Sequence, residues 1–232
     1  MKISSSTTTA SSPRFLLIGD SHAGAIGKAA RAEALPFCGG PMGSGRDFTV
    51  DFFDRCEGDV RFRKPPVERY YRGFLAELGI ARLAELKAPV VSTVGLSIHF
   101  YATNENWDVY RMRDGGFDPA FLSGRLFAAI VLAMARDAFA FYRELRAMGL
   151  RVVAVMPPQR VPQLSDPAIF FAAQEVVRRA IAATGAEIVD LRAATTDDAG
   201  FQRADLCEAN DPLHGSVAFG RLVLADLAER GV

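Results

Sequence analysis

The feature that most constrains this fold is an alternation of short apolar runs with longer segments of helical pattern. The apolar runs are bounded by Gly, Pro or polar residues and are predicted to be strands, at residues 14–18, 35–38, 90–94, 151–156 and 186–191. Helices are predicted over residues 23–34, 67–87, 119–148 (as one helix or two), 166–184 and 216–230. Strands alternating with helices are typical of a mostly parallel sheet covered on both faces. We therefore expect an α/β protein.

Length and charge narrow the class of protein. The chain has 232 residues, with 27 Lys plus Arg and 27 Asp plus Glu, so its formal net charge is zero. This balance gives no reason to expect nucleic acid as a partner. Residues 1–13 are polar and rich in Ser and Thr, which predicts a disordered leader before a single domain over residues 14–232. We see no secretory signal and no run long enough to span a membrane, so a cytoplasmic protein is expected.

Two segments interrupt the alternation. Residues 46–66 are predicted to be irregular or locally hairpin-like, with Phe48, Val50 and Phe52 alternating as in an exposed strand. Residues 98–118 form a long connection rich in aromatic residues, and connections of this length are usually functional.

The first candidate for chemistry is Ser21, in the run Gly19-Asp20-Ser21-His22. This run stands where the first strand meets the first helix, at the carboxyl edge of the predicted sheet, where α/β proteins bind ligands. A helix start also offers unpaired N–H groups. A serine nucleophile needs a base, a group that orients the base, and donors for an oxyanion. The alternative is that Asp20 or Ser21 merely caps the helix.

The second candidate is the pair Asp211 and His214, three residues apart in a loop before the last helix. An aspartate there can accept a bond from one ring nitrogen while the other nitrogen faces a serine. The alternative is a surface loop with a capping aspartate. Because both motifs belong to the same predicted sheet edge, we favour a Ser21, His214 and Asp211 catalytic set.

These two blocks resemble the SGNH hydrolase superfamily, the GDSL-type esterases and lipases. The nucleophile block is Gly19-Asp20-Ser21, and the Asp-x-x-His block runs from Asp211 to His214. The continuation His22 resembles the Gly-Asp-Ser-His variant that handles acyl groups on sugars. The resemblance implies a three-layer α/β/α sandwich with a five-stranded parallel sheet over residues 14–232. It also implies a serine esterase that works through an acyl-enzyme.

The resemblance assigns the oxyanion donors less sharply. It implies the N–H of Ser21 and a glycine N–H from the loop after the second strand. Gly40, Gly43 and Gly45 lie in that loop, and we favour Gly43. The family places a Gly-x-Asn after the third strand, whereas this chain has Gly95-Leu96-Ser97. Either the Ser97 hydroxyl donates in place of the asparagine, another side chain such as Asn104 reaches in, or activity is weak.

The remaining candidates are pocket residues. We expect a substrate to contact some members of a set made of Asp20, His22, Gly95, His99 and Asn104. Phe100, Tyr101 and Trp107 are candidates for an aromatic wall. The three histidines have no Cys or carboxylate at ligand spacing, so neither a metal nor another cofactor is expected.

The expected activity is hydrolysis of a small ester or of an acylated carbohydrate. Two alternatives stay open: an O-acyltransferase, which differs only in the acceptor, and an SGNH-like binding module of weak or no activity. The sequence leaves the substrate, the acyl length and the oligomeric state undefined.

Overall fold

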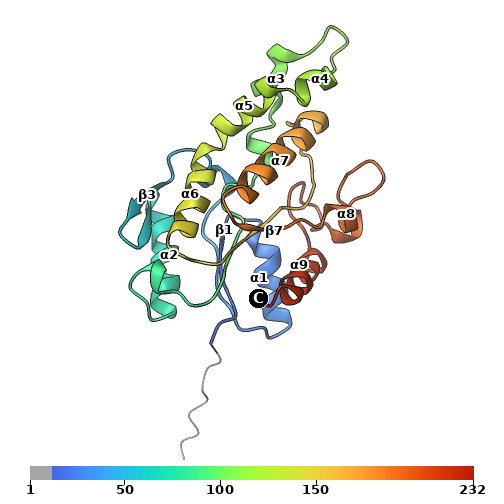
Figure 1. Ribbon diagram of the computed structural model, residues 1–232. Helices are drawn as coiled ribbons and strands as arrows, with labels where there is room; N and C mark the ends of the chain where they lie inside the picture. The colour runs from blue at the N-terminus through green and yellow to red at the C-terminus, as the bar shows by residue number, and fades with distance from the viewer. Residues whose placement is uncertain (1–11) are drawn as a thin grey trace, which may run out of the picture.

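The computed structural model describes residues 12–232, in which five strands form a sheet with every neighbouring pair parallel. The strands stand in the order β2-β1-β5-β6-β7 (Figure 1). Their bounds are Cys38–Pro41 for β2, Leu16–Gly19 for β1, Val90–Ser92 for β5, Val152–Val155 for β6 and Glu187–Val189 for β7. The predicted α/β class is confirmed. The leader predicted over residues 1–13 lies almost entirely outside the described residues.

Helices cover both faces of this sheet (Figure 1). On one face, α1 (Ala23–Ala32) and α9 (Val217–Glu229) pack closely against each other. On the other face lie α2 (Pro65–Glu77), α6 (Arg136–Ala147) and α7 (Pro167–Ala182). The architecture is therefore a three-layer α/β/α sandwich with two hydrophobic cores.

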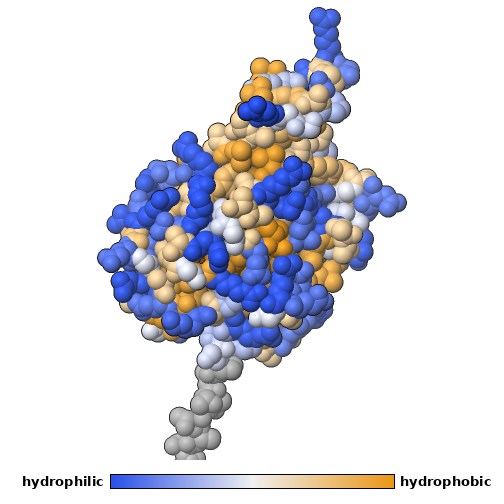
Figure 2. Space-filling model, in the orientation of Figure 1, coloured by the Kyte–Doolittle hydropathy of each residue, from blue (hydrophilic) through white to orange (hydrophobic). Residues whose placement is uncertain are grey.

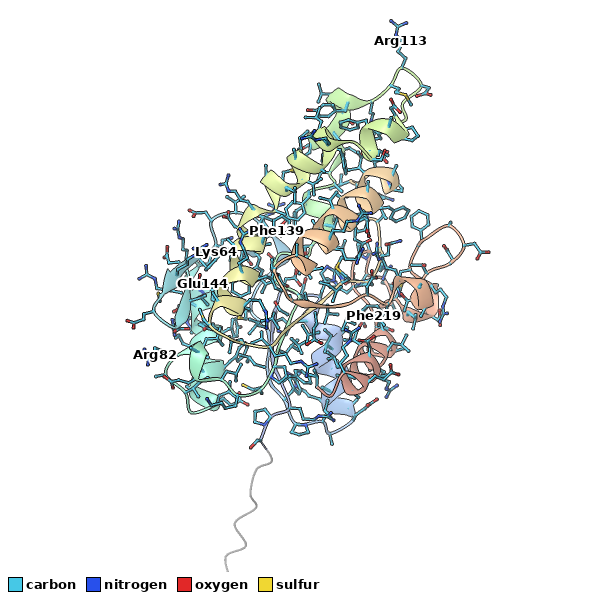
Figure 3. All side chains as sticks on the ribbon, viewed as in Figure 1. Lys64, Arg82, Arg113, Phe139, Glu144 and Phe219 are labelled. Carbon is cyan, nitrogen blue, oxygen red and sulfur yellow. The ribbon has the colours of Figure 1, made fainter. Side chains whose placement is uncertain are left out.

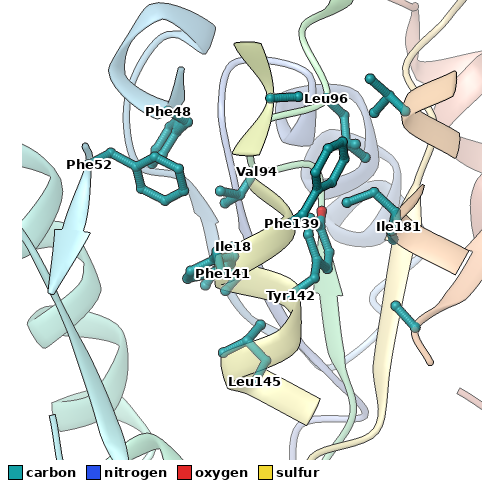
Figure 4. Packing of buried hydrophobic residues seen from close by; sticks show 14 of the residues in the cluster. Ile18, Phe48, Phe52, Val94, Leu96, Phe139, Phe141, Tyr142, Leu145 and Ile181 are labelled. Carbon is teal, nitrogen blue, oxygen red and sulfur yellow. The ribbon is translucent and has the colours of Figure 1, made fainter. Parts of the chain in front are cut away.

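Strand β1 shows how the sequence builds both cores. Successive side chains of a strand point to opposite faces, so an uninterrupted apolar run serves two layers. Leu16 and Ile18 join the core beneath α6, whereas Leu17 joins the core beneath α1 and α9. Figure 4 shows Ile18 packed near Phe141 and Leu145 of α6.

The second strand was predicted over residues 35–38, but β2 begins only at Cys38. Gly39 and Gly40, which were predicted to lie in a loop, belong to the strand. A side chain at Gly39 would place its Cβ 2.1 Å from the Leu17 carbonyl oxygen, and its φ is +98°. Only glycine permits this close approach to β1. Gly39 and Gly40, which indicate a turn in the sequence, instead allow β2 to pair closely with β1.

The segment after β2 differs from the prediction of an exposed strand. Residues Gly45–Phe48 form a 3-10 turn, and Phe48 and Phe52 are both buried in the aromatic core shown in Figure 4. The predicted hairpin exists, but it comes later, as β3 (Phe53–Cys56) paired antiparallel with β4 (Asp59–Phe62). The alternation of Phe48 and Phe52 therefore reflects their burial on one side of an irregular turn and not an exposed strand.

The segment predicted as a helix over residues 119–148 consists of α4 (Pro119–Leu122), α5 (Arg125–Met134) and α6, separated at Gly124 and Ala135. The helix predicted over residues 67–87 ends at Glu77. Short helices complete the list, α3 (Asn104–Trp107) and α8 (Arg192–Thr195).

A projecting arm is formed by α3, α4, α5 and the start of α7, and Arg113 lies at its tip (Figures 1 and 3). Apolar residues gather on the arm in Figure 2. Leu126 and Leu132 of α5 are exposed. No helix in residues 12–232 has both the length and the hydrophobicity needed to cross a bilayer.

Candidate active site

Ser21 lies in the turn that joins β1 to α1, at the carboxyl edge of the sheet. The turn is tight because Gly19 lacks a side chain: a Cβ there would lie 2.1 Å from the Thr93 hydroxyl oxygen that follows β5. The backbone N–H of Gly24 donates to the Ser21 carbonyl at 3.0 Å, which closes the first turn. Ser21 is partly exposed, and its side chain makes no hydrogen bond within residues 12–232.

Asp20, next to Ser21, is fully buried and hydrogen-bonded. Its Oδ1 accepts bonds from the His22 backbone N–H at 3.0 Å and from the Thr93 hydroxyl at 3.0 Å, and its Oδ2 accepts from the Ser97 hydroxyl at 2.6 Å. A buried carboxylate requires such donors. The prediction that Asp20 contacts substrate therefore needs correction, since it fastens the turn to the segment after β5.

Ser97 also differs from its expected role. Its hydroxyl is buried and gives its single proton to Asp20 at 2.6 Å. A proton held in this way is not available to an oxyanion, so the structure does not support Ser97 as an oxyanion donor. The Ser97 hydroxyl is also closely packed against the Gly45 backbone, because a Cβ at Gly45 would lie 2.2 Å from the Ser97 oxygen.

Asp211 and His214 form the second half of the site. Oδ1 of Asp211 accepts the N–H groups of Leu213 at 2.7 Å and of His214 at 2.8 Å, so the carboxylate folds the loop around itself. Its Oδ2 lies 2.7 Å from Nδ1 of His214. The spacing of three residues makes these contacts possible within one turn.

The electrostatics of this pair suit a base. Partial burial raises the pKa of Asp211, but the bonds from His214 and from the two N–H groups outweigh burial and lower the pKa to about 2. The ionised Asp211 favours the tautomer with its proton on Nδ1, which leaves a lone pair on Nε2. Nε2 of His214 is shielded from solvent and has no hydrogen-bond partner in the described part of the chain.

The two halves meet through His22. Its ring centroid lies 5.1 Å from that of His214, which brings the residue after Ser21 against the imidazole. The Ser21 hydroxyl and Nε2 of His214 are nevertheless not hydrogen-bonded within residues 12–232, where Nε2 has no partner. Catalytic bonds are often long in unliganded enzymes and tighten when substrate binds.

All three histidines of the chain lie together, which the sequence did not indicate. His22 stands between His214 and His99, whose ring centroid is 6.4 Å from that of His22. Burial lowers the pKa of His22, and burial with the neighbouring His22 lowers the pKa of His99 to about 4. Both rings are therefore neutral at pH 7. Residues 12–232 contain no group of His, Cys, Asp or Glu arranged to hold a metal.

The loop after β2 offers backbone donors. The N–H groups of Ser21, Gly43 and Gly45 have no acceptor in the described part of the chain. Gly43 is partly exposed, whereas Gly45 is buried against Ser97. Gly40 belongs to β2 instead. The choice of glycine donor thus stays between Gly43 and Gly45, with Gly43 the predicted residue.

The other predicted pocket residues have structural contacts. Gly95 is buried, and a Cβ there would lie 2.4 Å from the Ala138 side chain of α6. Asn104 begins α3, where its side-chain oxygen accepts a bond from Arg111 at 2.9 Å. Trp107 is fully buried and donates to the Tyr101 carbonyl at 2.6 Å. Gly95 therefore needs correction as a substrate contact, as does Trp107 as a wall, whereas Asn104 is partly exposed and stays a prediction.

No family model and no curated protein matches this chain. Among solved structures, it is similar to a "putative platelet activating factor" from Streptococcus pneumonia, at 12% identity over 97% of this chain and 86% of that chain, with a TM-score of 0.51. A lipase/acylhydrolase from Enterococcus faecalis gives 15% identity, 94% coverage of each chain and a TM-score of 0.47. A psychrotrophic esterase from Pseudoalteromonas sp. gives 15% identity, 93% and 95% coverage and a TM-score of 0.43. The first similarity shows a shared fold and no more.

Proposed function

We propose that this chain is a serine esterase, with Ser21 as nucleophile, His214 as base and Asp211 as the group that orients the base. The observation that carries the proposal is the Asp211–His214 pair. Asp211 orients the His214 ring through a 2.7 Å contact at Nδ1. Nε2 of the same ring is buried and has no partner in the described residues, and the ring packs against His22, which follows Ser21.

In the first step, Oγ of Ser21 attacks the acyl carbonyl carbon and Nε2 of His214 takes the hydroxyl proton. The carbonyl oxygen becomes an oxyanion, which the free N–H groups of Ser21 and Gly43 stabilise. The bond from the acyl carbon to the alcohol oxygen then breaks. Nε2 returns its proton to the departing alcohol, which leaves an acyl-enzyme on Ser21.

In the second step, His214 removes a proton from water, which attacks the acyl-enzyme. The acid leaves and Ser21 regains its proton from Nε2. An acyltransferase would follow the same path with a sugar hydroxyl in place of water. This transfer requires the Ser21 hydroxyl to come within hydrogen-bonding distance of Nε2 of His214.

The acyl group has a candidate pocket of about 350 Å³ beside Gly45, lined by Arg46, Thr49, Val50, Phe100, Tyr101, Asn106 and Met134. The Phe100 ring packs close to the Gly45 backbone, which stands next to the Ser97–Asp20 pair. An acyl chain seated there would run from the nucleophile turn onto an aromatic side chain. In this proposal Phe100 and Tyr101 line the acyl pocket as the predicted aromatic wall, and Trp107 does not contribute to it.

Hydrolysis of p-nitrophenyl acetate tests the proposal. The wild-type protein should release p-nitrophenol with burst kinetics, and Ser21→Ala should show only the background rate. Adding a sugar acceptor and analysing the products separates a hydrolase from a transferase. A folded wild-type protein with no turnover of this ester and no transfer would instead favour the binding-module alternative.

A further inference from the structure

Helix α5 is apolar on every side. Its residues 126–134 read Leu-Phe-Ala-Ala-Ile-Val-Leu-Ala-Met, with no polar side chain among them. Helices of this kind are normally enclosed by other elements, because a helix at the surface usually carries polar residues on its outer side. Within the described residues, however, only Phe127 and Val131 of α5 are fully buried. Part of the apolar surface of α5 is therefore left uncovered by the rest of the fold.

The uncovered part forms one continuous strip, which we call the α5 face. Leu126 is 58% exposed and Leu132 is 40% exposed. Ala129 and Ala133 are exposed as well. At about 100° per residue these four side chains fall within an arc of about 120°. Figure 2 shows apolar residues gathered on the arm to which α5 belongs. A contiguous exposed apolar patch usually marks an interaction surface.

Arginines stand at both ends of the α5 face. Arg125 begins α5 and Arg136 begins α6, and both side chains are exposed. In residues 12–232, Arg125 has no ion-pair partner and Arg136 has only Asp137, at 3.7 Å. The exposed acids of the arm lie outside α5, in residues 105–118. The α5 face is thus apolar along its length and positively charged at its two ends.

This charge pattern distinguishes two occupants of the α5 face. A second copy of the chain docked through the same face would bring arginines of the two copies together, whether the two α5 helices ran parallel or antiparallel. Like charges placed opposite each other across an interface oppose binding. An anionic lipid surface instead attracts the arginines and accepts the leucine side chains between its headgroups. The charges therefore favour a lipid surface.

We propose that the α5 face docks this protein on an anionic lipid surface. Leu126 and Leu132 insert at the level of the headgroups, and Arg125 and Arg136 bind the phosphates. Because α5 has ten residues, about 15 Å in length, it lies along the surface and does not cross the bilayer. Its last residue, Met134, lines the candidate acyl pocket, so the docked surface adjoins that pocket. Docking is independent of the esterase proposal, because it uses no residue of the catalytic set.

Flotation with vesicles of ether-linked phosphatidylglycerol tests the proposal, because ether-linked lipids offer no ester bond to hydrolyse. We expect the wild-type protein to float with these vesicles and not with vesicles of ether-linked phosphatidylcholine. Leu126→Ser/Leu132→Ser should weaken binding at least about fivefold, through the loss of inserted apolar surface. Leu222→Ser is the matched control, since Leu222 is 38% exposed on α9, which packs on the other hydrophobic core. Its binding should stay within about twofold of wild type.

Arg125→Gln/Arg136→Gln should weaken binding to phosphatidylglycerol about ten- to thirtyfold, because each arginine adds attraction to the anionic surface. Equal binding of the wild-type protein to both lipids, or unchanged binding of Leu126→Ser/Leu132→Ser, would overturn the proposal. A wild-type dimer in analytical ultracentrifugation that the leucine variant lacks would also overturn it, since a second copy would then cover the α5 face.

The two proposals fail separately. A wild-type protein that hydrolyses p-nitrophenyl acetate but does not float with phosphatidylglycerol disproves docking and leaves the esterase standing. A wild-type protein that floats but hydrolyses no ester supports docking and disproves the esterase.

Discussion

The turn that carries Ser21 and the loop that carries His214 differ in what their buried or half-buried carboxylates are bonded to. In the turn, the Asp20 carboxylate takes three donors and is sealed between β1 and the segment after β5. In the loop, Nε2 of His214, Nε2 of Gln202 and Oγ of Ser216 are all buried without partners within residues 12–232. The turn is not saturated throughout, since Nδ1 of His22 is also buried without a partner in the described residues. What differs is the anchoring: the Asp20 carboxylate ties its turn to Thr93 and Ser97, more than 70 residues away, whereas the Asp211 carboxylate binds groups of its own loop.

Ser21→Ala should have the largest effect on activity and almost none on stability. The hydroxyl has no partner to lose, while the nucleophile is indispensable to the acyl-enzyme, so we expect kcat to fall by at least about 10³-fold. Ester hydrolysis and urea unfolding measured on the same preparation check this. Loss of activity together with a large loss of stability would mean that Ser21 is a structural cap.

Asp211→Asn should reduce kcat by about 10³- to 10⁴-fold, as expected when the orienting carboxylate of a triad is replaced. The asparagine oxygen can still accept the N–H groups of Leu213 and His214, so the loop should keep its shape. Its amide would face Nδ1 and favour the wrong tautomer of His214. Stopped assays at pH 7 give the rate, and a rate within about threefold of wild type would exclude Asp211 from the mechanism.

Ser97→Ala separates two roles for this residue. If Ser97 supports Asp20, the variant loses a bond to a buried carboxylate and about 1.5–3 kcal/mol of unfolding free energy, with a smaller change in kcat. If Ser97 is an oxyanion donor, kcat falls about 10²- to 10³-fold with stability unchanged. Chemical denaturation beside steady-state kinetics decides between them, and we expect the first result.

The last prediction concerns pH. Burial lowers the pKa of His99 to about 4 in the folded protein, below the ordinary histidine value of 6.5, so between pH 4 and 6.5 the unfolded chain binds more protons. Stability should therefore rise from pH 4 to 6.5 through this residue, by at most about 3 kcal/mol, and gain nothing from it above pH 6.5. His99→Phe should flatten that part of the curve. An unchanged slope would mean that His99 is readily solvated.

The sequence predicted the chemistry of local motifs better than contacts across the chain. Asp211 and His214 are three residues apart, and a single turn dictates their contact, so the spacing was enough to find it. Ser97 is 77 residues from Asp20, and no local pattern announces their bond.

The fold was likewise predicted better where local patterns decide the structure than where contacts between distant residues do. The apolar runs predicted all five strands, whose bounds shifted where close packing decided them, as at Gly39. The segment predicted over residues 119–148 as one helix or two forms three, with breaks at Gly124 and Ala135. The alternation of Phe48 and Phe52 was misinterpreted because a 3-10 turn can also bury alternate side chains.

The most direct test of the central claim is labelling with a fluorophosphonate, followed by peptide mapping by mass spectrometry. The claim is that the serine after β1 and the imidazole before α9 act as one catalytic unit. We predict a single adduct on Ser21 in the wild-type protein, none in Ser21→Ala, and labelling slowed at least about 10²-fold in His214→Ala. Equal labelling of all three proteins, or a folded wild-type protein that takes no label, would contradict the account.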